Sequence, residues 1–463
     1  MGDRATAAEG APPRTGRPGA ERRRALEVLR DVRGGERAEA SFARRAAELD
    51  SRQRAFLMEL AYGAIRWRRR LDYHLADLLE GDLERLPPDV LSILELGAYQ
   101  LLFMDRVPVW SAVDESVRLA RGALPGHTAG WASGLVNGVL RNLVRRRESL
   151  PLPDPSDPVL YLSIRHSHPE WMVARWLARF GAETTAALLV HNNEPPGLHL
   201  AVNGRRATPG AVLEAILAAG HEASLHPLKT DAIVVGPGAR PEELPGWSEG
   251  HFWVQDAAAQ WVVQVAGHPC EADVPSRGRF LDACAAPGGK LCGLLARGGH
   301  ALATDSDPAR LARVRQNCER LGFAERWIAA ADARALPTAE RFPLVLADVP
   351  CTGTGVLRRR VDARWRRRPG DVAAFAELQR EILDRLAEHV LPGGSLVYAT
   401  CSLEPEENED VVAAFLASSS AFRRDPVAEQ VPAGLRDGPY LATRPWTGDH
   451  DGMFAARLVR EAA

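Results

Sequence analysis

Strand candidates alternate with helix candidates from residue 276 to the end of the chain, and this rhythm constrains the fold more than any other feature. The predicted strands are 279–283, 300–304, 343–348 and 395–400, and the main predicted helices are 309–321, 371–391 and 406–417. Strands joined by helices at this spacing predict a parallel sheet with helices on both faces, whose ligands bind at the carboxyl ends of the strands. We therefore predict an α/β, Rossmann-like domain over residues 276–463.

The first part of the chain has a different pattern. Residues 20–147 carry apolar side chains at helical spacing, for example Leu71, Leu75 and Leu78, and almost no strand signal. This predicts an all-α bundle. Four prolines between Glu148 and Pro158 predict a Pro-rich extended linker over 148–164, and the Ala, Gly, Pro and Arg content of residues 1–19 predicts a disordered tail.

Residues 165–275 mix both kinds of element. Helix candidates at 170–180 and 209–219 accompany strand candidates at 198–202 and 232–235. The segment predicts a small α+β module that presents substrate to the following domain. The predicted architecture is multidomain, with an all-α bundle, a small α+β linker module and an α/β Rossmann-like domain.

Composition excludes several classes of protein. No stretch of 18 apolar residues and no signal-peptide pattern occurs in the 463 residues, so we expect a cytoplasmic protein without a membrane partner. The six cysteines include no C-x-x-C pair, which fits neither a disulfide framework nor a zinc site. We expect no metal, a reducing compartment, and buried structural roles for Cys270, Cys292 and Cys318.

A glycine loop follows the first predicted strand of the α/β domain. It runs through Cys284, Ala285, Ala286, Pro287, Gly288, Gly289 and Lys290. Glycines allow a tight turn and close approach to a ligand, and the following helix offers unpaired N–H groups. Asp305 ends the next strand, where an acidic residue would bind ribose hydroxyls. A phosphate-binding P-loop is excluded because Cys284 and Leu291 stand where Gly and Ser/Thr are needed. A plain strand–helix turn without ligand is the alternative.

Two cysteines each follow a predicted strand of the same domain. Cys351 ends the stretch 346–351 and Cys401 lies in the stretch 397–402. Two thiols beside a nucleotide-type loop suggest covalent chemistry on a bound base.

Four motifs in this order resemble those of a known family. They are Cys284-Ala-Ala-Pro-Gly-Gly-Lys290, Asp348-Val-Pro-Cys351-Thr-Gly-Thr-Gly355, Tyr398-Ala-Thr-Cys401-Ser402 and Pro405-Glu-Glu-Asn408. The domain resembles the S-adenosylmethionine-dependent RNA cytosine-C5 methyltransferases of the Sun/NSUN class. Residues 20–147 resemble the RNA-binding module of the antitermination factor NusB, with Gly97-Ala-Tyr-Gln-Leu-Leu102 and Gly134-Leu-Val-Asn-Gly-Val-Leu-Arg141. The fusion is similar to bacterial Sun-type enzymes that methylate 16S ribosomal RNA.

The resemblance implies a role for each motif. Cys401 would be the nucleophile that adds to carbon 6 of cytosine, Cys351 would assist product release, and Asp348 would lie against base and cofactor. The 284–290 loop, Asp305, Asp332 and Asp348 would bind S-adenosylmethionine. A rival assignment exists, because DNA cytosine methyltransferases place their nucleophile in a Pro-Cys turn like Pro350-Cys351. The sequence pattern alone does not decide which of the two thiols is the nucleophile, and the family resemblance favours Cys401.

Basic clusters are the expected RNA contacts, because a net charge of -2 provides no global attraction. The clusters at 66–70 and 145–147 fit RNA contact or a solvated helix surface. The run 358–368 has seven arginines around a tryptophan directly after the Cys351 turn, which favours RNA contact. The predicted RNA-binding residues are Arg358, Arg359, Arg364, Trp365, Arg366, Arg367 and Arg368.

The sequence leaves two functions of different class. The chain is either a monomeric RNA methyltransferase, with small-subunit ribosomal RNA as the expected target and transfer RNA as the alternative, or an RNA-binding assembly or antitermination factor with a vestigial methyltransferase fold. The joint presence of both thiols, Lys290 and Asp348 argues against the second function.

Overall fold

The computed structural model describes residues 19–79, 83–268, 278–427 and 431–462, and the chain divides into two compact units. The first unit contains the described residues up to Leu189 together with Arg360–Arg366. The second contains Val190–Arg359 and the described residues from Arg367 onward. The predicted tail lies almost wholly outside the described residues, as does Cys270.

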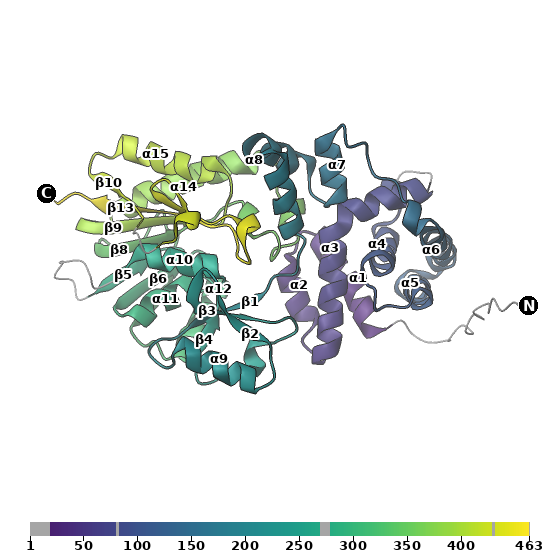
Figure 1. Ribbon diagram of the computed structural model, residues 1–463, viewed down its shortest axis with the longest axis horizontal. Coiled ribbons are helices and arrows are strands. Elements are labelled where there is room, and N and C mark those ends of the chain that lie inside the picture. The colour runs from purple at the N-terminus through teal and green to yellow at the C-terminus, as the bar shows by residue number, and fades with distance from the viewer. Residues whose placement is uncertain (1–18, 80–82, 269–277, 428–430, 463) are drawn as a thin grey trace, which may run out of the picture. The chain divides into compact units, whose positions relative to one another are not determined.

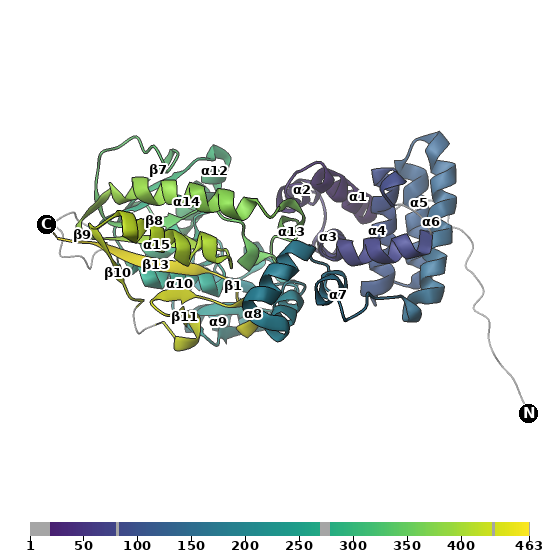
Figure 2. The same ribbon diagram turned by 90° about the horizontal axis from the view of Figure 1, so that it is seen from above.

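The first unit is helical, as predicted (Figure 1). Its helices are α1 Ala20–Arg33, α2 Ala38–Arg45, α3 Ser51–Leu79, α4 Pro88–Phe103, α5 Val109–Ala123, α6 Gly126–Arg146, α7 Pro158–Arg165, α13 Ala363–Arg366 and most of α8 Glu170–His191. Helices α5 and α6 lie side by side in both views (Figures 1 and 2). Apolar faces of α1, α3, α4 and α6 form one core, in which Leu26, Leu57, Ile93 and Leu140 are fully buried.

The predicted linker is only partly extended, because α7 begins inside it at Pro158. The Asp157 side chain accepts a hydrogen bond from the backbone N–H of Leu160 at 3.0 Å, and Pro158 occupies the first helical position. An aspartate cap followed by proline is a helix-start signal. The density of prolines obscured that signal, so the prediction of a linker through residue 164 is wrong for its second half.

Part of the arginine run folds with the helical unit. Val361 is fully buried in the bundle core, and the Trp365 indole N–H donates to the backbone carbonyl of Ile65 at 2.7 Å. The buried Arg364 guanidinium donates to the carbonyl of Ser167 at 3.1 Å. These contacts explain why Arg360–Arg366 belongs to the first unit although its neighbours in sequence belong to the second.

A small antiparallel sheet opens the second unit, with the strand order β2-β3-β1-β4. Its elements are β1 Leu198–Val202, α9 Pro209–Ala218, β2 Ala223–His226, β3 Lys229–Val235 and β4 Phe252–Val254. Strands β1 and β3 and helix α9 match the predicted elements. The short strands β2 and β4 and the helix α10 Ala257–Ala266 were not predicted. Helix α10 joins this sheet to the next one, because Ala258, Val262 and Val263 share a core with Phe280 and Leu346.

The large sheet has the order β11-β12-β13-β9-β8-β5-β6-β7, and β10 also pairs with β13. Its strands are β5 Arg279–Asp282, β6 His300–Asp305, β7 Arg326–Ala330, β8 Phe342–Asp348, β9 Val390–Thr400, β10 Phe422–Asp425, β11 Arg436–Asp437, β12 Tyr440–Ala442 and β13 Phe454–Arg460. Its helices are α11 Gly289–Arg297, α12 Pro308–Leu321, α14 Asp371–Ala387 and α15 Glu409–Ser418. Helices α14 and α15 cover one face, and α10, α11 and α12 cover the other (Figure 1).

The sheet is mixed rather than wholly parallel. Strands β7, β6, β5, β8 and β9 run parallel, whereas β13 pairs antiparallel with β9. The prediction missed the antiparallel part because β10 to β12 are short, and no predicted helix separates them from β13. Asp282 aligns near Leu346 on β8, and Asp348 aligns with Ala399 on β9, so the carboxyl ends of these strands meet at one edge.

No helix among the described residues combines the length and the apolar character that crossing a bilayer requires.

Candidate active site

Two neighbouring parallel strands bring the predicted thiols together. Cys351 follows β8 and Cys401 follows β9, and their Sγ atoms lie 3.0 Å apart. The backbone N–H of Cys401 also points at the Cys351 sulfur, at 3.3 Å. The pair is therefore fixed by the sheet register and does not depend on a flexible loop.

The two thiols lie in different environments. Cys351 is 8% exposed, and the hydrogen bond with Cys401 together with burial raises the pKa of its thiol well above the usual value. Cys401 is half-buried. Because a buried thiol with a raised pKa keeps its proton, Cys351 can donate a hydrogen bond to the Cys401 sulfur, while its own sulfur accepts from the Cys401 backbone N–H. Cys401 is the more accessible sulfur of the pair.

A single carboxyl group connects the turns that carry both cysteines. The Glu407 side chain accepts hydrogen bonds from the Thr352 backbone N–H at 2.8 Å and from the hydroxyls of Thr352 and Ser402. The Gln379 amide donates to the same carboxylate at 3.0 Å and to the Pro350 carbonyl at 2.9 Å. Glu407 is fully buried, and burial raises its pKa. The motif 405–408 pointed to the family, but the sequence assigned no role to this residue.

Glycine is required where the Cys351 turn meets the turn after β12. The Gly355 N–H donates to the Cys401 carbonyl at 2.9 Å, and the Gly452 N–H donates to the Gly355 carbonyl at 2.8 Å. A Cβ atom on Gly355 would lie 2.3 Å from the Gly452 carbonyl oxygen. No side chain fits there, so Gly355 allows the two turns to pack directly.

The predicted glycine loop lies at the same edge of the sheet. Gly288 has the left-handed conformation, with φ of 104°, and caps α11. The Lys290 ammonium donates to Asp348 Oδ2 at 2.7 Å, which joins the loop to the strand that precedes Cys351. Cys284 is a poor nucleophile, because burial raises the pKa of its thiol well above the usual value.

Three strand-end carboxylates surround this loop. Asp305 is 4% exposed and accepts from the N–H groups of Ala286 at 3.2 Å and Asp307 at 3.0 Å. Asp282 is buried, and burial together with the charge of Asp348 raises its pKa to about 8. The described residues offer the Asp282 oxygens only the nearby backbone N–H of Cys284. An acidic edge with an incompletely satisfied carboxylate suits a ligand that brings positive charge and hydroxyl groups.

Asp332 lies beyond β7 and is about half exposed. The Arg334 guanidinium binds its carboxylate at 2.8 Å, and this hydrogen bond lowers the Asp332 pKa. The N–H of Ala331 donates to the Asp305 carbonyl at 3.1 Å, so the Asp332 turn adjoins the end of β6.

Comparison with known proteins identifies the family. The family described as "16S rRNA methyltransferase RsmB/F" matches residues 273–459, the NusB family matches 20–145, and the RsmF/B-like ferredoxin-like domain matches 168–238. Ribosomal RNA small subunit methyltransferase B of Pseudomonas syringae pv. tomato is 38% identical over 425 residues, which cover 90% of this chain and 91% of that protein. The protein of the same name from Klebsiella pneumoniae subsp. pneumoniae is 35% identical, covering 89% and 91%.

The chain belongs to the RsmB/F family of 16S rRNA methyltransferases. Its fold agrees with that assignment. The crystal structure of PH0851 aligns with a TM-score of 0.79 at 21% identity, covering 97% of this chain and 99% of that one. The structure of NSun6 from Pyrococcus horikoshii aligns with a TM-score of 0.56 at 19% identity, covering 64% and 99%.

The cofactor of this RsmB/F-family protein is S-adenosylmethionine, and the acidic edge fits it. The molecule carries an ammonium, a sulfonium and two ribose hydroxyls. Asp305 and Asp348 are carboxylates of the kind that bind such groups, and the carboxyl group of Asp282, whose pKa is raised, offers further oxygen atoms to hydroxyl or ammonium donors.

The predicted RNA-binding residues of the RsmB/F-family chain fall into distinct environments. Arg358 and Arg364 are buried, at 3% and 0% exposure, which does not fit a surface contact with RNA. The Trp365 indole N–H is taken by Ile65, and Arg367 donates to the carbonyls of Thr352 at 2.8 Å and Cys351 at 3.1 Å. Arg366 and Arg368 are exposed. RNA contact therefore stays a prediction for Arg359, Trp365 and Arg367, which are partly buried, and for Arg366 and Arg368, which are exposed.

Arg358 and Arg359 belong to an ion network that sequence patterns did not reveal, in which the side chains of Arg358, Asp256 and Asp451 are buried and that of Asp449 is exposed. Arg358 binds Asp449 at 2.6 Å, while Arg359 binds Asp451 and Asp256, each at 2.7 Å. His199 on β1 lies 3.2 Å from Asp256 and 3.2 Å from Asp449. The hydrogen bond with His199 and the charge of Arg358 lower the Asp449 pKa. The network ties the small sheet to the 449–451 turn, whose neighbour Gly452 packs on the cysteine turn.

Proposed function

We propose that this RsmB/F-family enzyme methylates carbon 5 of a cytosine in 16S rRNA through a covalent adduct between Cys401 and carbon 6. The observation that carries the proposal is the pair of sulfur atoms, which lie 3.0 Å apart. The turn that carries Cys351 follows the strand that ends at Asp348, and Asp348 binds Lys290 of the glycine loop. Family membership supports the RNA class, and the thiol pair supports the choice of cytosine carbon 5.

The chemistry requires a nucleophilic sulfur because carbon 5 of cytosine is weakly nucleophilic. Addition of a thiolate to carbon 6 gives carbon 5 enamine character and makes it reactive. The bound cofactor supplies an electrophilic methyl group. Afterwards the proton on carbon 5 must leave, and the carbon 6–sulfur bond must break to regenerate the thiolate and the aromatic base.

Cys401 is the better nucleophile of the two thiols. It is more accessible than Cys351, and the protonated Cys351 thiol can donate a hydrogen bond that stabilises a thiolate on Cys401. The same Cys351 thiol can assist expulsion of Cys401 from the adduct. This favours the assignment of Cys401 to attack and of Cys351 to release over the rival assignment, in which Cys351 of the Pro-Cys turn attacks carbon 6.

The remaining residues orient the reactants. The loop from Cys284 to Lys290, with Asp305 and Asp332, would hold the cofactor, and Asp348 would lie against cofactor and base. Lys290 keeps Asp348 in place through its ion pair. Glu407 keeps the two cysteine turns in register through its bonds to Thr352 and Ser402.

The proposal is tested by incubating the protein with S-adenosylmethionine and either 16S rRNA or total tRNA, followed by bisulfite sequencing. We expect one protected cytosine in the 16S rRNA and none in the tRNA. Mass spectrometry of the digested nucleosides identifies the methylated atom, and methyl groups on another base, or on another atom of cytosine, would overturn the assigned chemistry. Protected cytosines in tRNA alone would overturn the assigned RNA.

A further inference from the structure

Cys351 and Cys401 have the geometry of a thiol pair that can form a disulfide. Their Sγ atoms lie 3.0 Å apart, and a disulfide has an S–S distance of about 2.0 Å. Bond formation therefore needs the sulfur atoms to approach by about 1 Å, a movement within reach of small side-chain rotations. The two cysteines leave the sheet as neighbours, because β8 and β9 pair in parallel up to Asp348 and Ala399. Neighbouring strands lie about 4.8 Å apart, which is within the Cα separations that a disulfide spans.

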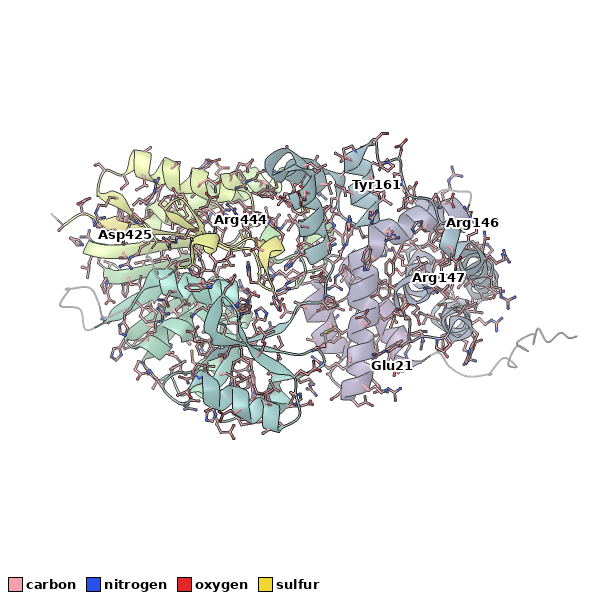
Figure 3. The ribbon with its side chains drawn as sticks, viewed as in Figure 1. Glu21, Arg146, Arg147, Tyr161, Asp425 and Arg444 are labelled. Carbon is pink, nitrogen blue, oxygen red and sulfur yellow. The ribbon has the colours of Figure 1, made fainter. Side chains whose placement is uncertain are left out.

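The segment after β12 limits how far the two sulfur atoms can separate. The register of β12, β13 and β9 places Arg444, which Figure 3 labels, at the sheet edge from which Cys401 emerges. Further along this segment, the Gly452 N–H donates to the Gly355 carbonyl at 2.8 Å, and the Gly355 N–H donates to the Cys401 carbonyl at 2.9 Å. These backbone bonds hold the two cysteine turns against each other.

The two sulfur atoms differ in the way that a peroxide-sensitive pair requires. Cys401 is half-buried and within reach of a small oxidant, whereas Cys351 is 8% exposed. The hydrogen bond with Cys401 and burial raise the pKa of the Cys351 thiol, so this thiol keeps its proton and can stabilise a thiolate on Cys401. Peroxide-sensitive sites combine an accessible thiolate with a neighbouring thiol that resolves the oxidised sulfur.

The other described cysteines lack one of these two properties. Cys292 and Cys318 form a hydrogen bond with each other, but they are only 1% and 0% exposed. Cys284 is partly exposed, but burial of its sulfur raises the pKa of the thiol well above the usual value and keeps it protonated. Among the described cysteines, contact between thiols and access for an oxidant coincide at Cys351 and Cys401.

We propose that hydrogen peroxide converts Cys351 and Cys401 into a disulfide, which stops methylation until a dithiol reduces it. The Cys401 sulfur attacks one peroxide oxygen and becomes a sulfenic acid, while the O–O bond breaks and the other oxygen leaves as water with the Cys401 proton. The Cys351 sulfur then attacks the sulfenic sulfur, and its proton leaves with the hydroxyl group as a second water. Both sulfur atoms are oxidised, and the peroxide is reduced.

The disulfide would protect the nucleophile as well as stop it. Without a resolving thiol, a sulfenic acid is oxidised further to a sulfinic acid, which thiols do not reduce. Cys351 intercepts the sulfenic acid on Cys401 before that step. Formation of the disulfide does not depend on the proposed function, whereas the loss of methylation rests on it, because a Cys401 sulfur bound to Cys351 cannot attack carbon 6.

The test treats the full-length protein with hydrogen peroxide in the absence of RNA and S-adenosylmethionine. The protein is then denatured and alkylated with iodoacetamide, and its peptides are mapped by mass spectrometry. We expect the peptides of Cys351 and Cys401 to be joined and lighter by two hydrogen atoms, which leaves four of the six cysteines alkylated. Methyl transfer should fall to the level of Cys401→Ala, and dithiothreitol should restore the activity. Peptides that stay separate would overturn the proposal.

Two controls test access and resolution. Cys292 and Cys318 are the matched pair within the same chain and should stay alkylated, because no oxidant reaches them. Oxidation of both pairs to the same extent would overturn the role assigned to access. In Cys351→Ala, Cys401 should gain two oxygen atoms that dithiothreitol does not remove. Full recovery of the Cys401 thiol in this variant would overturn the role of Cys351 as the resolving thiol.

The activity of the untreated protein separates this proposal from the proposed function. If the untreated protein methylates no cytosine but the two peptides are joined by peroxide, the proposed chemistry has failed and the disulfide stands. If it methylates and peroxide joins no peptides, only the disulfide proposal has failed. Undiminished methylation by the fully oxidised protein would overturn both the control by peroxide and the role of Cys401 as nucleophile.

Discussion

The Sγ atoms of Cys351 and Cys401 lie 3.0 Å apart because β8 and β9 are parallel neighbours, and each strand ends immediately before its cysteine turn. The proximity means that either thiol can influence the charge on the other. Under the proposed mechanism, in which Cys401 attacks and Cys351 assists release, loss of each sulfur should block a different step.

Cys401→Ala should abolish both methyl transfer and the covalent RNA complex, because no sulfur attacks carbon 6. Cys351→Ala should still attack and methylate but release slowly, so that a protein–RNA complex accumulates. A denaturing gel with RNA and S-adenosylmethionine measures this complex. Exchanged phenotypes would assign attack to Cys351, and absence of a trapped complex in both variants would argue against two-thiol catalysis.

Glu407→Gln should impair both the fold and the turnover. The carboxylate accepts hydrogen bonds from Thr352, Ser402 and Gln379. The amide group of glutamine has one oxygen and one NH₂ group, so its NH₂ group would face some of these donors. One such buried mismatch costs about 1–3 kcal/mol. Urea unfolding and single-turnover methylation measure the two effects. Asp410→Asn, at an exposed position of α15, is the control and should behave as the parent.

Asp305→Asn should weaken S-adenosylmethionine binding without preventing folding. The carboxylate accepts hydrogen bonds from the backbone N–H groups of Ala286 and Asp307 and forms an ion pair with Arg310. Its loss therefore disturbs the glycine loop as well as any contact with the ribose. Calorimetry measures the affinity, and Ser306→Ala, at an exposed neighbouring position, is the control. Equal affinities for all three proteins would remove Asp305 from the cofactor site.

Arg359, in the ion network, and the exposed Arg366 and Arg368 should affect different kinetic quantities. Arg359→Lys should lower kcat about 10- to 100-fold without changing KM for RNA, because the ion network holds the turns beside Cys401 in reactive geometry. Replacing exposed Arg366 and Arg368 by Gln should instead weaken RNA binding and flatten its salt dependence. The same salt slope as the parent would assign these two residues to a solvated surface.

Asp282 should make stability fall as pH rises. Its pKa is about 8 in the folded protein, above the ordinary aspartate value, so the folded state holds one more proton than the unfolded state between about pH 4 and 8. The stabilisation is complete below this interval and is lost as pH rises through 8. Unfolding of the cofactor-free protein at pH 6 and 8 measures the change, which should be smaller in Asp282→Asn. An equal pH dependence in both proteins would contradict the assignment.

Much of the site was predictable because its chemistry lies in contiguous motifs. The 284–290 loop, Cys351 and Cys401 each follow a strand, and a parallel sheet brings strand ends together without further information. The roles of Glu407, Arg358 and Arg359 were not predictable in this way. Their partners lie far away in sequence, and a run of arginines has the same pattern whether it faces solvent or buried aspartates.

The fold was predictable to a similar extent. Strands β5, β6, β8 and the second half of β9 match their predicted ranges closely, because they are the buried strands of the sheet and carry its apolar residues. The predicted helix 371–391 ends at Ala387, and β9 begins at Val390, within a stretch whose apolar residues suit either element. Strands β11 and β12 have too few residues to show a period, and β10 has only charged residues after Phe422.

The position of Val361 and Trp365 in the helical unit has a consequence for biosynthesis. A ribosome completes α1 to α7 long before it reaches Arg360–Arg366, yet Val361 fills the bundle core and Trp365 binds Ile65. The nascent bundle therefore emerges with the site of these two side chains unfilled, and the segment that fills it comes from the middle of the later-made catalytic domain. A chain released before this segment is made should expose that apolar site to chaperones and proteases.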